Sequence, residues 1–152
     1  MMFDRLWSLL SGDAASGRAA PSERLSTAVL LLELARADFE IAAVERKRVA
    51  GLLAQRYDLD ESGAESLIAQ AEAEVGAAVS LFDYLKTLNT ELEPAGKRQL
   101  MEMLWEVAYA DGRLDMNEEQ LLRKLADLLY VAERDYIGAK LAVLERREAA
   151  RG

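Results

Sequence analysis

Carboxylates recur at equivalent places in this chain, and they are the side chains best suited to chemistry. Asp38 aligns with Asp111 at a spacing of 111 − 38 = 73 residues. At the same spacing, Glu45 aligns with Glu118. Carboxylate oxygens are the ligands that hard divalent cations such as calcium, magnesium and manganese prefer. The candidate metal ligands in the two groups are Asp38, Glu40, Glu45, Asp111, Asp115 and Glu118.

The acidic turns belong to a longer internal repeat. The only two prolines, Pro21 and Pro94, lie at the same spacing. Further identical pairs are Leu31 and Leu104, Glu33 and Glu106, Ala35 and Ala108, Ala37 and Ala110, Leu52 and Leu125, and Tyr57 and Tyr130. Each copy predicts an apolar helix, a turn that begins with Ala-x-Ala-Asp, and a second helix. The alanines suit a close helix crossing, whereas no core needs the acidic residues.

Two interpretations of the acidic turns are open. In the first, carboxylates of both copies face each other, and a divalent cation supplies the counter-charge that they need. In the second, they only cap helices. Asp115 and Glu118 form an Asp-x-x-Glu capping box, which stabilises a helix start by about 1 kcal/mol. Capping does not account for Asp38 and Asp111, because both precede the second helix by too many residues.

The second turn, residues 111–118, resembles the end of an EF-hand calcium loop. The first two ligand positions of such a loop would be Val107 and Tyr109, and neither side chain can bind a cation. As an independent calcium site the turn is therefore incomplete.

Composition excludes several kinds of site. The chain has no cysteine and no histidine, which excludes disulfides, thiolate nucleophiles, zinc sites of the Cys/His type and imidazole catalysis. Pairs of acidic residues could do hydrolytic work, but no pattern of a substrate pocket accompanies them. We therefore expect a protein that is not an enzyme. The absence of cysteine fits a cytoplasmic location.

Charge argues against nucleic acid as a partner. The net charge is −8, and binding to phosphates needs a clustered basic face. The basic clusters 46–48 and 146–147 lie among glutamates, so we interpret both as solvated ion-pair faces. Glu33 and Glu106 lie within apolar helices, where a buried carboxylate needs partners. We expect them to pair with Arg or Lys of a neighbouring helix, the alternative being support of a cation site.

Helical periodicity runs through the chain, and no segment alternates as a strand does. The prediction is an all-α fold, a single compact bundle of about seven helices built from two related helix-turn-helix halves. Its helical domain covers residues 21–149, after a short amphipathic helix at 1–10 and a flexible linker at 11–20.

The N-terminal helix carries one apolar stripe, formed by Phe3, Leu6, Trp7 and Leu10. The stripe could dock on the helical domain, or it could contact a membrane surface or the groove of a partner. No apolar run approaches the ~20 residues of a membrane span, and the N-terminus does not have the pattern of a signal peptide.

Residues 104–115, Leu-Trp-Glu-Val-Ala-Tyr-Ala-Asp-Gly-Arg-Leu-Asp, together with Glu118, Glu119 and residues 126–129, resemble the TerB, or tellurite-resistance B-like, family. Residues 34–41 are similar to the N-terminal motif of its stand-alone bacterial branch. The resemblance covers roughly residues 22–145. It implies an all-helical fold of two related halves, which is shared with the N-terminal domain of DjlA-type co-chaperones.

The resemblance also implies a function. The family is associated with resistance to tellurite and related stress, with TerC-like membrane proteins as partners, and with a proposed metal-binding acidic surface. Its acidic positions fall here at Asp38, Glu45, Asp111, Asp115 and Glu118. The first turn departs from the second, since Phe39 replaces the glycine and Ala42 replaces the second aspartate.

We therefore expect a non-enzymatic interaction module with a divalent cation as its ligand and with no other cofactor. Its partner would be a protein such as a TerC-like membrane protein. The expected location is cytoplasmic, with peripheral contact at the inner face of the membrane as one option and a homodimer as another. The alternative is a structural adaptor or co-chaperone-type domain whose acidic turns only cap helices. The cation hypothesis requires the two acidic turns to be neighbours in space.

Overall fold

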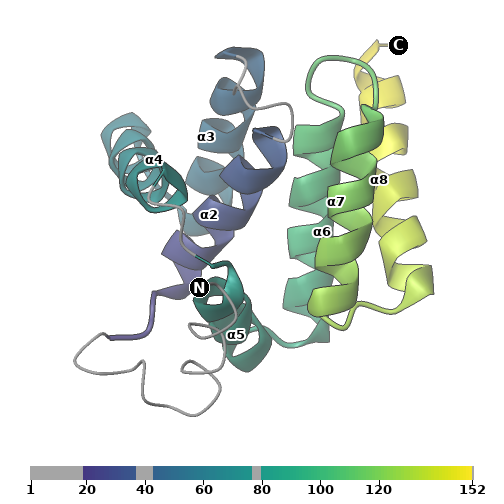
Figure 1. Cartoon of the computed structure of the whole chain (residues 1–152). Helices are drawn as coiled ribbons and strands as arrows, with labels where there is room; N and C mark the ends of the chain where they lie inside the picture. The colour runs from purple at the N-terminus through teal and green to yellow at the C-terminus, as the bar shows by residue number, and fades with distance from the viewer. Residues whose placement is uncertain (1–18, 37–42, 77–79, 152) are drawn as a thin grey trace.

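The structure of the chain, a computed structural model, describes residues 19–36, 43–76 and 80–151. Over these residues it is built of helices and contains no strand (Figure 1). The helices are α2 (Glu23–Ala35), α3 (Ala43–Tyr57), α4 (Glu61–Gly76), α5 (Phe82–Glu91), α6 (Pro94–Ala108), α7 (Met116–Leu128) and α8 (Glu133–Arg151). The predicted all-α bundle is confirmed. The predicted helix at 1–10, with its apolar stripe, lies outside the described residues, as does most of the linker.

Local signals fix where several helices begin. Ser22 is the N-cap of α2, and its hydroxyl accepts a hydrogen bond from the Leu25 amide at 3.1 Å. Asp60 accepts one from the Gly63 amide at 2.7 Å, just before α4. Pro94 is the first residue of α6, where the amide hydrogen that proline lacks has no intrahelical partner. These helix starts can be predicted because capping depends on neighbours in sequence.

The same kind of C-terminal cap follows α3 and α7. Asp58 and Tyr130 have positive φ angles, 53° and 57°. In each case the amide of the next residue donates to a carbonyl five residues earlier, at 2.9 Å. This is the geometry of a left-handed helix cap. The caps lie 130 − 58 = 72 residues apart. The spacing has therefore changed by one, and Tyr130 corresponds in space to Asp58 rather than to Tyr57.

The repeat includes a third helix in each half. α4 packs against α2, and its counterpart α8 packs against α6. At a spacing of 72 residues three buried positions coincide: Ala64, Leu67 and Ala71 correspond to Tyr136, Ala139 and Val143. None of these pairs is identical, so sequence identity showed only two helices per half.

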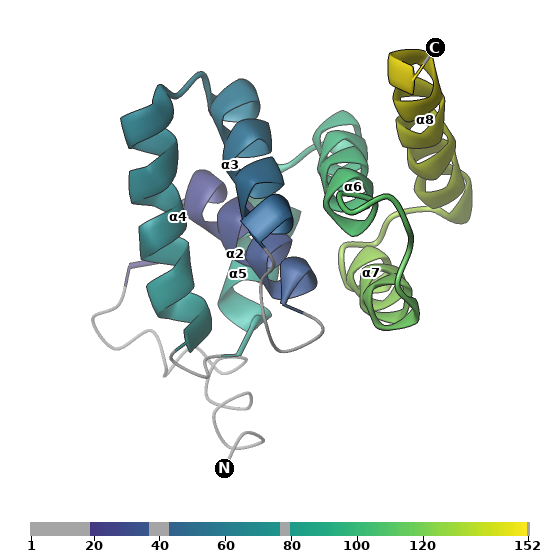
Figure 2. The same cartoon turned by 90° about the horizontal axis from the view of Figure 1, so that it is seen from above.

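The two halves are related by a pseudo-twofold arrangement. α2 contacts α6, and the other contacts between the halves are reciprocal, since α3 reaches α6 and α7 reaches α2. Figure 2 shows α2 to α4 on one side and α6 to α8 on the other. α5 connects the halves and packs against α2. The core lies where the first helices of the two halves meet, and it includes the fully buried Leu30, Leu31, Leu104 and Trp105.

α2 is the most deeply placed helix. All residues from 26 to 32 are buried. A helix that is apolar on every side belongs either in the core of a protein or in a membrane. α2 has 13 residues and lies in the core. Among the helices in the described part of the chain, none combines the length and the apolar character that a membrane span requires.

Candidate functional site

The turn between α6 and α7 is held by its own acidic residue. The carboxylate of Asp111 accepts a hydrogen bond from the Arg113 amide at 3.1 Å. Gly112 has a φ of 94°, a left-handed conformation that favours glycine. An aspartate that bonds the backbone two residues further on forms an Asx turn. Asp111 thus has a structural role that the capping interpretation missed, and the Asp-Gly pair was the local signal for it.

Asp115 caps α7, as the second interpretation predicted. Its Oδ1 accepts hydrogen bonds from the amides of Asn117 at 2.7 Å and Glu118 at 3.3 Å. Both bonds satisfy amides at the helix start that have no intrahelical partner. The capping function of Asp115 is therefore confirmed.

Glu45 and Glu118 occupy matching, buried positions in the two halves. Glu45 is the third residue of α3 and is 9% exposed; Glu118 is the third residue of α7 and is 4% exposed. Carboxylates are rarely buried unless they have polar or charged partners. The first turn of a helix is a favourable place for them, because its dipole is positive there. Each half thus holds one buried carboxylate at the start of its second helix.

The structure places only part of the predicted metal site. Asp111, Asp115 and Glu118 share one turn, whereas Asp38 and Glu40 lie outside the described residues. Over the described ranges, no three acidic side chains come together in a way that could hold a metal ion. The end of α2 and the α6–α7 turn lie at the same end of the bundle (Figures 1 and 2). Cation binding across the two halves stays a prediction.

Glu106 has the basic partner that the sequence predicted. Glu106 is 5% exposed, and its carboxylate forms an ion pair with Arg48 of α3. Its repeat counterpart, Glu33, is only half-buried. The ion pair crosses from one half to the other, which fits the contact between α3 and α6.

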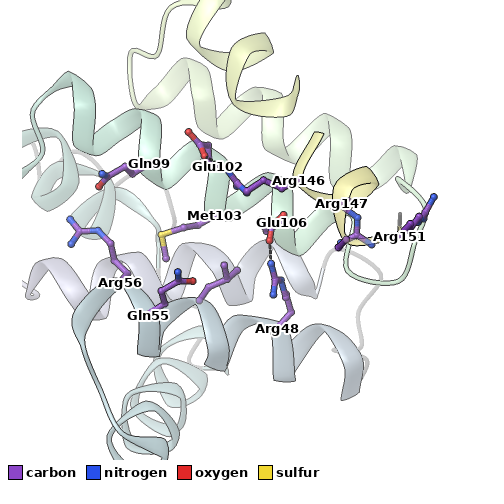
Figure 3. A pocket seen from close by; sticks show the side chains of 12 residues that line it. Arg48, Gln55, Arg56, Gln99, Glu102, Met103, Glu106, Arg146, Arg147 and Arg151 are labelled. Carbon is purple, nitrogen blue, oxygen red and sulfur yellow. Dashed lines mark hydrogen bonds and ion pairs between the residues drawn. The ribbon is translucent and has the colours of Figure 1, made fainter. Parts of the chain in front are cut away.

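Beside this ion pair lies a groove of about 960 Å³ between α3, α6 and α8. Five arginines line it, and Figure 3 shows them around Met103 and the two acidic residues of α6. The lining residues are Arg48, Leu52, Gln55, Arg56, Gln99, Glu102, Met103, Glu106, Arg146, Arg147, Ala150 and Arg151.

The sequence did not predict this gathering of arginines. Arg46 behaves as expected, since it pairs on the surface with Glu72 and Glu65 of α4 at 3.1 Å. Arg48, two residues further on, instead meets Arg146 and Arg147 in the groove. Burial lowers the pKa of Arg48, and the charges of Arg147 and Arg146 lower it further. Helical periodicity does not predict which helices pack together. It therefore could not show that the basic clusters 46–48 and 146–147, which lie about a hundred residues apart in sequence, meet in the fold.

Comparison with known proteins gives one match. The sequence model of a family described as "Tellurite resistance protein TerB" matches residues 24–141. This range runs from the start of α2 into α8 and includes both acidic turns. No curated protein and no solved structure matches the chain.

Proposed function

The chain belongs to the tellurite resistance protein TerB family, and on this premise we propose that it is a non-enzymatic interaction module of a tellurite- and stress-resistance system. In this proposal the acidic turns bind a hard divalent cation, which regulates contact with a protein partner. The observation that carries it is the matched pair of buried carboxylates, Glu45 and Glu118, one beside each turn.

The chemistry of the α6–α7 turn supports a cation as ligand. Asp111 lies in the tight turn at Gly112, Asp115 is the N-cap of α7, and the buried Glu118 is the third residue of that helix. Both aspartates already bond backbone amides, which fixes the direction of their carboxylates. Pre-oriented oxygen ligands favour a hard cation, and the chain has no cysteine or histidine that would favour zinc.

Calorimetric titration with calcium, magnesium and manganese tests the cation. We expect binding in the micromolar to low-millimolar range for the wild type and weaker binding for Asp111→Asn, which removes the charge but keeps an oxygen for the Asx turn. Asp127→Asn is the matched control, because Asp127 is an exposed acidic residue of α7 away from the turn. An absence of binding heat in the wild type, or an equal effect of both substitutions, would contradict cation binding.

The proposed partner is a protein, and the family points to TerC-like membrane proteins. This chain would then act in the cytoplasm and at the inner face of the membrane, with the stripe of Phe3, Leu6, Trp7 and Leu10 as a peripheral contact. Capture of partners from the native host, with and without a chelator, tests this. A TerC-like protein that is retained only when the cation is present would support the regulatory role.

The competing function is a structural adaptor or co-chaperone-type domain with no cation. It is favoured by one observation, that Asp111 and Asp115 both have bonds within the turn that account for them. On this view Asp115→Ala lowers the melting temperature by the same amount with and without cation. On the cation view the loss is larger when cation is present, because bound ligand stabilises only the intact fold.

A further inference from the structure

The groove between α3, α6 and α8 has a charge opposite to that of the whole chain. Five arginines and two glutamates line it, a formal balance of 5 − 2 = +3, whereas the chain carries −8. A concave, positively charged surface on an acidic protein attracts negative ligands and increases their rate of association.

The arginines of the groove are not shared by the other half of the repeat. At the spacing of 73 residues, Arg48 corresponds to Leu121 and Arg56 corresponds to Leu129. The pairs that the halves do share include core residues, such as Leu52 and Leu125. The duplicated scaffold therefore folds without arginine at these positions, and the charge of the groove is a feature of its own.

Part of this positive charge is not used within the fold. Glu106 is occupied by Arg48, and Glu102 pairs with Arg146 at 2.7 Å. Among the residues that the structure describes, Arg147 and Arg151 have no acidic side chain within 4.0 Å. Two guanidinium groups at one end of the groove are thus available to a ligand.

The positive charges of the groove lie far apart, and Arg56 is shared with Glu23 of α2 at 3.6 Å. Figure 3 shows Arg56 at one end of the groove and Arg147 and Arg151 at the opposite end, with Met103 between them. Along α3 alone, the eight steps from Arg48 to Arg56 span about 12 Å at 1.5 Å per residue. A ligand that reaches both ends needs negative groups separated by at least this length.

We propose that this groove binds an acidic segment of a partner protein, one that carries carboxylates at both ends and apolar side chains between them. Guanidinium groups hold carboxylates through paired hydrogen bonds, which fits both ends of the groove. The apolar side chains of the segment contact Leu52 and Met103 between them, while Gln55 and Gln99 offer amides to its backbone. A single phosphate group would reach one end only. This inference rests on the proposed interaction function and names the chemistry of its partner.

Fluorescence anisotropy with the full chain tests the proposal. The probe is a fluorescein-labelled synthetic peptide of about 12 residues made of glutamate and leucine, long enough in an extended or helical form to span the groove. We expect it to bind the wild type, and Arg147→Glu/Arg151→Glu to weaken binding by about tenfold or more. Arg147→Gln/Arg151→Gln should also weaken binding of the peptide, but by a smaller factor, because it removes the positive charges without adding negative ones.

Lys124→Glu/Arg134→Glu is the matched control, because these two basic residues are exposed, lie outside the groove, and change the net charge equally. Unchanged binding in this variant supports the proposal. Equal weakening in both pairs, no binding by the wild type, or equal binding of a peptide with glutamine in place of glutamate would overturn it. A fluorescent ATP analogue that binds the groove where the peptide does not would also overturn it, in favour of a phosphate ligand.

The cation titration concerns a different part of the molecule, the α6–α7 turn. If the wild type binds the cation but not the peptide, only the proposal about the groove is refuted. If it binds the peptide but not the cation, only the proposal about the cation is refuted.

Discussion

Glu106 shows how this fold accommodates a buried charge. The residue is 5% exposed, and its partner Arg48 comes from the other half of the molecule. A buried ion pair adds little stability over an apolar pair of the same size, but removing one partner leaves an uncompensated charge. Arg48 is therefore required by Glu106 as well as by the groove.

We predict that Arg48→Met lowers the free energy of unfolding by about 2–3 kcal/mol, because the buried Glu106 carboxylate then lacks its positively charged partner. Urea unfolding at neutral pH measures this. The double variant Arg48→Met/Glu106→Leu should recover much of the loss. If Arg48→Met costs less than about 0.5 kcal/mol, as an ordinary surface change does, the ion pair is not a structural requirement.

Tyr57 gives a prediction about alkaline pH. Its hydroxyl donates to the Glu23 carboxylate at 2.7 Å and is hydrogen-bonded to the Thr27 hydroxyl at 2.9 Å. Burial is the main cause that raises the pKa of Tyr57 from 10.0 to about 12. The folded state holds this proton more tightly than the unfolded state, so the resulting stability is complete below pH 10 and is lost as the pH rises towards 12.

Stability measured between pH 9 and pH 12 should therefore fall less steeply in Tyr57→Phe than in the wild type. At neutral pH the same variant should lose about 1 kcal/mol, the usual net value of a hydrogen bond. Tyr130→Phe is the control, because that ring is 81% exposed. If stability falls with pH equally steeply in Tyr57→Phe and in the wild type, the raised pKa of Tyr57 is contradicted.

At the scale of single residues, the sequence predicted roles that depend on near neighbours. The cap at Asp115 followed from the residues directly after it. The pairing of Glu106 followed from burial of a charge, although its partner could not be named. Arg147 and Arg151 became candidates only when α8 was placed beside α3 and α6.

At the scale of elements, the α6–α7 turn depends on one backbone conformation. Gly112 has a φ of 94°, and a Cβ at this position would meet no atom within 4 Å. The cost of a side chain there is therefore conformational and not steric crowding. At Gly51 a Cβ would also meet no atom within 4 Å, but this glycine lies inside the regular helix α3, where alanine is not strained.

We predict opposite effects of the same substitution at these two positions. Gly112→Ala should destabilise the protein by about 1 kcal/mol, because alanine is strained at this φ. Gly51→Ala should stabilise it by about 0.5–1 kcal/mol, because alanine loses less entropy in a helix. Thermal or urea unfolding measures both. Equal signs for the two variants would refute the conformational explanation.

The helices themselves were predictable where caps mark them, as at Ser22 and Asp60. The third helix of each half was harder to recognise as part of the repeat. Ala64 and Tyr136 occupy the same buried position but differ in size, and the spacing has changed from 73 to 72 residues before them. Packing preserves burial and not identity, so a comparison of residue types stops at the second helix.

At the scale of the whole molecule, the two halves share a scaffold and differ in their surfaces. The reciprocal contacts of α3 with α6 and of α7 with α2 keep the halves related. The positive charge of the arginine groove is not repeated in the other half, because leucines replace Arg48 and Arg56 there. A duplicated fold can in this way offer an acidic end for a cation and a basic groove for a partner.

The most direct test of cation binding across the two halves is a manganese titration followed by nuclear magnetic resonance on isotope-labelled protein. Manganese broadens the signals of nearby nuclei. We expect the amide signals of Gly112 and Glu118, at the α6–α7 turn, to broaden at the same manganese concentration as those of Ala43 and Glu45 at the start of α3. Excess magnesium should reverse the effect, and Asp38→Asn should reduce it in both places. Broadening confined to one half, or absent from both, would contradict a shared cation.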